Sequence, residues 1–152
     1  MIKAEIITFL MAMVPVVELR GAIPYGVVSG LSVHTAFILA VIGNLVPIPV
    51  LVVFTRKVFE WLRTKSGSLD RMVCRLESKA EKNKVLVERY EFLGLMILVA
   101  VPLPGTGAWT GALVAAMMNM RLKTAMPAII AGVLIAGIIV TTVTYGAGAL
   151  LN

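Results

Sequence analysis

The sequence predicts an all-α integral membrane protein built as an inverted repeat, each half being a re-entrant helical hairpin followed by a transmembrane helix. Of the 152 residues, 59% are hydrophobic and only 14% are charged, whereas soluble domains carry about 25% charged residues. The mean hydropathy of +0.96 points the same way. An internal similarity predicts the repeat, and two Pro/Gly breaks predict the hairpins. We therefore expect one membrane domain over the whole chain.

The repeat is visible in residues 14–44 and 101–132, which begin with the same Val-Pro pair. Each segment then passes a Gly-Ala pair, reaches a short polar turn with a Thr-Ala pair, and enters a long apolar run. The Val-Pro pairs are 87 residues apart and the Thr-Ala pairs 89 residues apart. We expect repeat 1 over 1–55, a connecting segment over 56–91 and repeat 2 over 92–152, an organisation common in transporters.

The second apolar stretch of each repeat is long enough to cross a membrane as one helix. Residues 35–55 would span about 31 Å, which matches a bilayer core, and 124–151 would span it with room for tilt. The first stretch of each repeat is divided instead. Its breaks lie at 15–24 and at 102–107, where prolines and glycines interrupt the helix, and each remaining piece is too short to cross alone.

Two topologies are open at this point. If each divided stretch crosses the membrane, the protein has four spans, and 121–123 emerges opposite the basic segment 56–91. If each stretch turns at its break and exits on the side it entered, the halves are inverted, 121–123 returns beside 56–91, and both termini face outward. We favour the hairpins. Their tips should meet near the midplane, because irregular backbone at membrane depth must be buried in protein or line a watery cavity.

The connecting segment 56–91 holds ten Lys or Arg residues against six Asp or Glu residues. By the positive-inside bias it should face the cytoplasm. Its apolar residues recur at steps of three and four after Gly67, which predicts an amphipathic helix that lies on anionic lipid or covers a partner subunit. Cys74, the only cysteine, lies in this segment, so the chain has no internal disulfide.

The hairpin tips carry the chemistry. Glu18 and Arg20 are the only charged residues between 6 and 55, and a charge in lipid costs at least about 2.5 kcal/mol unless it is paired or functional. We expect a short helix to begin after Gly21 and another after Gly105-Thr106-Gly107, and both to direct their free N–H groups, together with Arg20, at one anionic group. Glu18 would neutralise Arg20 when the site is empty or carry a coupling proton. Alternatively, the two charges form a structural ion pair that locks the hairpin.

The candidate residues for binding substrate or protons are Glu18, Arg20, Gly21, Asn44, Gly105, Thr106, Gly107, Trp109 and Thr110. Asn44 is a mid-span amide that needs a partner, and helix packing explains it as well as substrate contact does. Trp109 and Thr110 would line a pocket or simply pack. A single histidine without nearby cysteines or an acid cluster argues against a metal site, and we expect no cofactor.

Two motifs carry a resemblance to a known family. They are PVVELRGAIPYG at 15–26 and PLPGTGAWTG at 102–111, with Gly43-Asn44 between them. Together they resemble the small multidrug export proteins over nearly the whole chain. More distantly, the chain is similar to the DedA superfamily of bacterial and archaeal membrane proteins, which pair re-entrant hairpins and include members implicated in moving polyprenyl phosphate lipid carriers. The resemblance implies a prokaryotic cytoplasmic membrane, although this chain lacks a second acid and a second arginine at the second tip.

The function we expect is transport of an anionic amphiphile such as a polyprenyl phosphate lipid carrier, with or without coupling to protons. The alternative is proton-coupled export of small drugs, and a second alternative is a structural membrane protein without transport. An enzyme is not expected, because no nucleophile, base and orienter can be assembled from these residues. The expected partners are membrane lipids and a second subunit that pairs through small residues in 132–148, with no nucleic acid.

Overall fold

The computed structural model describes residues 2–65, 67, 71, 84–103 and 105–146. Helices account for all the regular structure of these residues, which confirms the all-α prediction. The helices are α1 (Ile2–Met13), α2 (Glu18–Val28), α3 (Val33–Leu45), α4 (Ile48–Lys65), α6 (Lys84–Ala100), α7 (Ala108–Met117) and α8 (Leu122–Tyr145). Most of the predicted amphipathic stripe, together with Cys74, lies outside the described residues.

Two segments are long and apolar enough to cross a membrane, Val33–Lys65 and Leu122–Tyr145. The first of them contains α3 and α4 in succession, so the predicted single helix over 35–55 is interrupted, with Val46 and Pro47 between the two parts. Pro47 and Pro49 have no N–H, so the carbonyls four residues earlier lose their helical donors. The second segment is one continuous helix of 24 residues, about 36 Å long.

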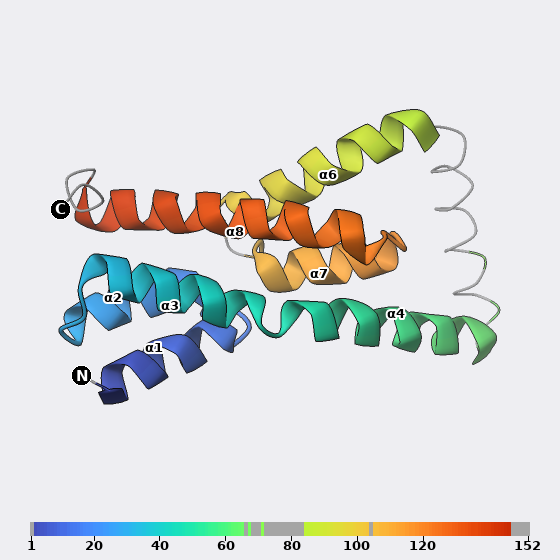
Figure 1. The fold of residues 1–152 in the computed structure, drawn as a ribbon. Helices are drawn as coiled ribbons and strands as arrows, with labels where there is room; N and C mark the ends of the chain where they lie inside the picture. The colour runs from blue at the N-terminus through green and yellow to red at the C-terminus, as the bar shows by residue number, and fades with distance from the viewer. Residues whose placement is uncertain (1, 66, 68–70, 72–83, 104, 147–152) are drawn as a thin grey trace.

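The two long segments run side by side in opposite directions, and the short helices fill the two ends of the molecule (Figure 1). Helices α1 and α2 pack on each other and on α3 at the end that carries the N-terminus. Helices α6 and α7 occupy the other end, where α6 packs on α8 and α7 packs on α4. Each short pair therefore turns back in the middle of the molecule.

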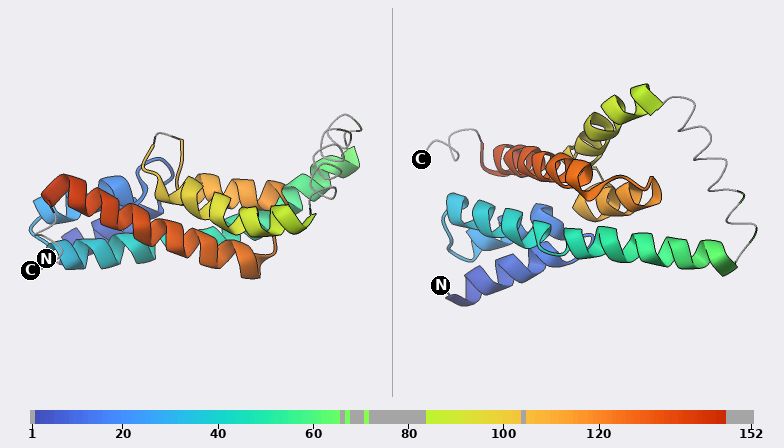
Figure 2. Two further views of the ribbon diagram at one scale, coloured as in Figure 1. Left: turned by 90° about the horizontal axis from the view of Figure 1, so that it is seen from above. Right: turned by 45° about the vertical axis from the view of Figure 1, so that its right-hand side comes forward.

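The turns of the two pairs lie next to each other, as the left view of Figure 2 shows. We call residues 14–17 the first connection and residues 101–107 the second connection. The first connection is tight, because Val16 has a φ of 78° and Glu18 a φ of 48°, values that residues other than glycine seldom adopt. The expectation of a helix that starts after Gly21 is wrong, since α2 begins at Glu18 and contains Pro24. The expectation of a helix after Gly107 is confirmed by α7.

The chain reversals that follow α2 and α7 share one hydrogen-bond pattern. The N–H groups of residues 29, 30 and 31 donate to the carbonyls of 25, 27 and 26, and those of 118, 119 and 120 donate to 114, 116 and 115. Every member of one set is 89 residues from its counterpart. The left-handed residue is Gly30, with a φ of 93°, in the first reversal and Asn119, with a φ of 52°, in the second.

Small residues let the short helices approach the long ones. A Cβ on Gly43 of α3 would overlap the carbonyl oxygen of Phe9, and a Cβ on Gly132 of α8 would lie 2.7 Å from the carbonyl oxygen of Met96. Gly137 likewise packs against Phe37 within the chain. Gly132 and Gly137 thus contact residues of the same chain, and the pairing of two subunits through residues 132–148 stays a prediction.

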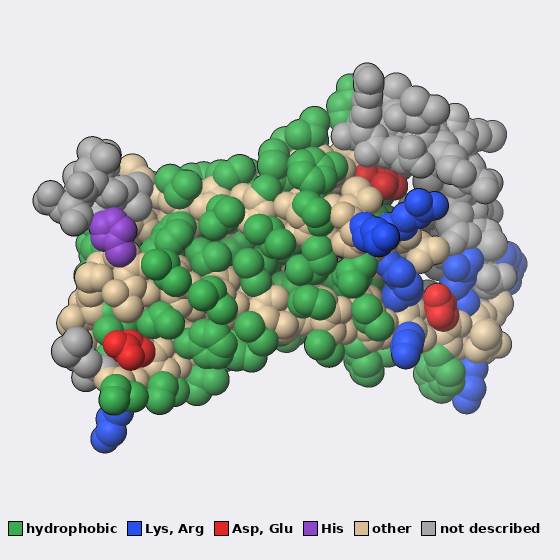
Figure 3. Space-filling view, viewed as in Figure 1, with side chains coloured by type: hydrophobic (Ala, Val, Ile, Leu, Met, Phe, Trp, Pro, Cys, Tyr) green, Lys and Arg blue, Asp and Glu red, His purple; other side chains and the backbone are tan. Residues whose placement is uncertain are grey.

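The surface is apolar along its length and charged at one end. Figure 3 shows hydrophobic side chains over the middle of this face and Lys or Arg side chains gathered where α4 ends and α8 begins. Arg56 of α4 donates to the carbonyl of Met120, so the start of α8 lies beside the basic part of α4. We call the region where α4 ends and α8 begins the basic end.

Candidate functional site

The site lies where the first and second connections meet, halfway along the molecule (Figure 2). Glu18 and Arg20 are both on the first turn of α2, and both reach the other half of the chain. They are only two residues apart, yet Arg20 binds the second connection and Glu18 binds the first residues of α7, which follow it. Each therefore joins the two halves of the chain, and in the described residues they do not bind each other.

Glu18 caps the N-terminus of α7. Its side chain is only 4% exposed, and its Oε1 accepts a hydrogen bond of 3.1 Å from the backbone N–H of Trp109. The backbone N–H of Ala108 also faces this carboxylate. A helix usually receives such a bond from its own N-cap side chain, but the N-cap here is Gly107, which has none. The carboxylate thus satisfies N–H groups of α7 and lies at the positive end of its dipole.

Gly107 makes this cap possible. Its φ of 133° and ψ of −172° form a combination almost restricted to glycine. A Cβ at this position would overlap the carboxylate of Glu18. The absence of a side chain is therefore what lets the acid of one half reach the helix of the other.

Arg20 binds the second connection itself. Its guanidinium donates to the carbonyl oxygens of Leu103, at 2.5 Å, and Val101, at 3.2 Å, and to Thr106 Oγ1 at 2.9 Å. Thr106 Oγ1 also lies 2.6 Å from the Val101 oxygen and 2.8 Å from the Leu103 oxygen. These acceptors are neutral, so they satisfy the donors of Arg20 without neutralising its charge. The planar fork of arginine suits this set of acceptors, which a lysine could not match.

This geometry changes the predicted anion site. Both positive helix ends were expected to face one anionic group, whereas the positive end of α7 faces Glu18. The positive end of α2 is not free there either, because the first residue of α2 is Glu18, which carries the acidic side chain itself. The anion at the meeting point is a side chain of the protein.

The remaining predicted residues are spread around this meeting point. Thr110 donates to the carbonyl of Gly105, whose φ is 82°, and this bond shapes the second connection. Gly21 packs against Val17 in its own half. Asn44 is fully buried, and neither of its amide atoms has a hydrogen-bond partner in the described part of the chain. The indole N–H of Trp109 is likewise buried without a described partner.

Two participants could not have been chosen from the sequence. The carbonyls of Val101 and Leu103 bind Arg20, but a backbone acceptor leaves no signal in the residue type. Among the described residues, no three His, Cys, Asp or Glu side chains lie together as a metal site would require.

Comparison with known proteins gives one match. A family model described as "Putative small multi-drug export protein" matches residues 18–139 of the 152. The matched region begins at Glu18 and includes every residue of the site. No curated protein and no solved structure matches the chain, and no comparison shows the DedA resemblance.

Proposed function

The chain belongs to this small multi-drug export family, and from that premise we propose that it exchanges protons for small amphiphilic compounds across a membrane, with Glu18 as the proton-carrying group. The observation that supports the proposal is the bond between the Glu18 carboxylate and the N-terminus of α7. It couples the protonation state of one side chain to the contact between the two halves.

Protonation acts on this contact through charge. An ionised carboxylate at a helix N-terminus gains from both the charged hydrogen bond and the helix dipole. A protonated carboxyl loses the dipole term and most of the hydrogen-bond strength, so the connections separate more easily. The three bonds of Arg20 do not depend on that proton and would keep the second connection folded while α7 moves.

Export follows if substrate and proton compete for the same carboxylate. A cationic amphiphile would pair with ionised Glu18 when α7 moves away, and a proton arriving from the other side would displace it. The charge at Glu18 is thereby satisfied in turn by α7, by substrate or by a proton, which a buried carboxylate requires.

We propose in addition that the two short helix pairs are re-entrant hairpins of an inverted repeat. Support comes from the matching reversals at an offset of 89 residues and from the matching close approaches at Gly43 and Gly132. The meeting of both connections in the middle of the molecule supports it too (Figure 1). The basic end then faces the cytoplasm.

A second candidate is translocation of an anionic amphiphile such as a polyprenyl phosphate. The observation that favours it is Arg20, whose three described hydrogen bonds all go to neutral oxygens. When Glu18 leaves α7, the N–H groups of that helix and the guanidinium of Arg20 would both face the vacated position, which suits a phosphate.

Transport in proteoliposomes distinguishes these candidates. The protein is reconstituted with an imposed pH gradient, and uptake of a cationic amphiphilic dye is compared with flipping of a labelled polyprenyl phosphate. Glu18→Gln should abolish proton-driven dye uptake while the protein stays folded. Glu5→Gln is the matched control, because Glu5 is an acid in the first turn of α1. Dye uptake by Glu18→Gln at the wild-type rate would refute the proposal, and flipping without dye uptake would establish the second candidate.

A further inference from the structure

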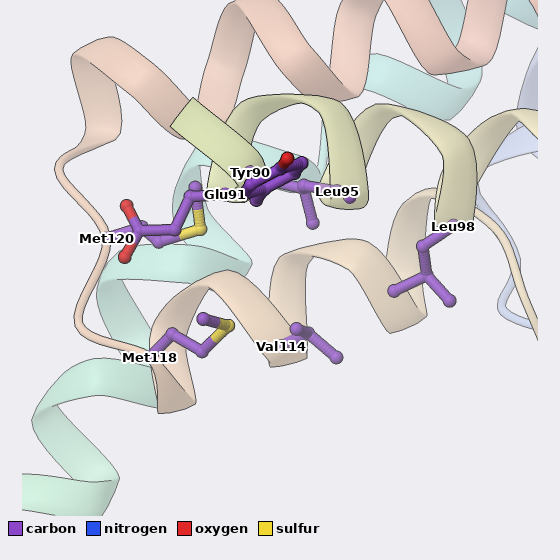
Figure 4. A pocket seen from close by; sticks show the side chains of 8 residues that line it. Tyr90, Glu91, Leu95, Leu98, Val114, Met118 and Met120 are labelled. Carbon is purple, nitrogen blue, oxygen red and sulfur yellow. The ribbon is translucent and has the colours of Figure 1, made fainter. Parts of the chain in front are cut away.

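A second site lies between α6 and α7, away from the connections. It is a cavity of about 250 Å³ with an almost wholly apolar wall. The side chains of Leu95 and Leu98 on α6 lie opposite Val114 and Met118 on α7, as Figure 4 shows. Its wall is completed by Tyr90, Glu91, Gly94 and Met120. We call this cavity the α6–α7 groove.

The groove starts at the basic end and runs toward the middle of the molecule. From Tyr90 to Leu98 it follows α6 for about 12 Å, which is long enough to hold an eight-carbon chain. Met120, at its outer end, accepts a hydrogen bond from Arg56. Arg121 and Lys123 follow Met120 in sequence and are exposed. An apolar slot therefore opens beside three cations.

Arg56 is not saturated by its contacts. Its Nε is buried without a hydrogen-bond partner in the described part of the chain, and its described bond is to a neutral carbonyl. One acidic side chain, Glu91, lines the mouth of the groove and is already engaged within the chain. Among the described side chains, Arg56, Arg121 and Lys123 outnumber Glu91 at the mouth, and this balance favours an anion.

We propose that the α6–α7 groove binds one acyl chain of an anionic phospholipid, whose phosphate lies against Arg56 at the basic end. An apolar tail matches the lining of the groove, and the guanidinium of Arg56, whose described bond goes to a neutral carbonyl, would attract a phosphate oxygen. The cytoplasmic leaflet, where the basic end is expected to lie, carries such lipids. This site is separate from Glu18 and does not depend on the export proposal.

Gly94 offers a sharp test. It lines the groove, and a Cβ placed there would meet nothing within 4 Å. Gly94→Leu should fill the groove while favouring the helix, because leucine has the higher helix propensity. Leu93→Phe is the matched control, since Leu93 is exposed on the same helix and is not part of the groove.

The measurement is the thermal shift of the purified full-length protein in detergent on titration with short-chain lipid. Dioctanoyl phosphatidylglycerol should stabilise the wild type more than dioctanoyl phosphatidylcholine does, and glycerol 3-phosphate, which has no tail, should give no shift. Gly94→Leu should weaken phosphatidylglycerol binding at least about tenfold, and Leu93→Phe should leave it unchanged. Arg56→Gln should remove the preference for the anionic lipid.

Three results would overturn the proposal: equal shifts with both lipids, a full shift with glycerol 3-phosphate, or wild-type affinity in Gly94→Leu. If Arg56→Gln does not fold, Gly94→Leu still decides the matter, because it leaves Arg56 in place. The thermal-shift measurement needs no proton gradient, so a negative result in it does not contradict proton-driven export. Conversely, if the transport assay shows no export, the thermal shifts still decide whether the groove binds lipid.

Discussion

Gly107→Ala should separate the two connections, because the new Cβ would overlap the carboxylate of Glu18. Two terms set the size of the effect. The backbone of Gly107, with a φ of 133°, costs any other residue about 1–3 kcal/mol. Displacing the carboxylate also breaks a charged hydrogen bond to Trp109, a loss of about 1.5–3 kcal/mol. We expect the free energy of unfolding to fall by about 2.5–6 kcal/mol in total.

Gly105→Ala is the matched control for this substitution. Gly105 has a φ of 82°, but a Cβ there would have nothing within 4 Å. Only backbone strain applies, and the expected loss is about 1–2 kcal/mol. Thermal unfolding of both variants in nanodiscs measures the difference, which contains the loss of the contact with Glu18 and any difference in backbone strain between the two glycines.

The same contact can be tested by combining substitutions. In a Glu18→Ala background the carboxylate is absent, so Gly107→Ala should lose its excess over Gly105→Ala. An unchanged excess in that background would refute the cap between the two halves. Equal losses for the two glycines in the wild type would refute it as well.

Other predictions follow from the same structure. Gly43→Ala and Gly132→Ala should destabilise the protein by similar amounts, because both bring a Cβ onto a backbone carbonyl of the neighbouring short helix; a large loss for only one would contradict a repeat. Asn44→Leu should raise the thermal stability by about 1–3 kcal/mol, since it removes a buried amide without a described partner; a fall would show that the amide is bonded. Cysteine labelling in a Cys74→Ser background should find Asn152 outside the cell, and a cytoplasmic Asn152 would refute the hairpin topology.

Much of the architecture could be predicted because it depends on local composition. Apolar length predicts the long segment Leu122–Tyr145, and Pro15 and Gly105 lie at or beside the turns of the two helix pairs. Charge asymmetry predicts a basic end. The start of α7 after Gly107 was predictable as well, because glycine supplies the backbone freedom that the turn needs. The start of α2 was not, since Val16 and Glu18 adopt positive φ values that their side chains disfavour.

The sequence by itself determined that this chain is apolar and helical, that its charges concentrate in one segment, and that Glu18 and Arg20 are its exceptional residues. The tertiary structure alone decided what those two residues bind. Their partners lie more than 80 positions away and are mostly backbone groups, which every residue possesses. No pattern of side chains can indicate which N–H or carbonyl will be left free by a helix end or a turn. That depends on where α7 begins, and on how closely Gly107 allows the two halves to approach.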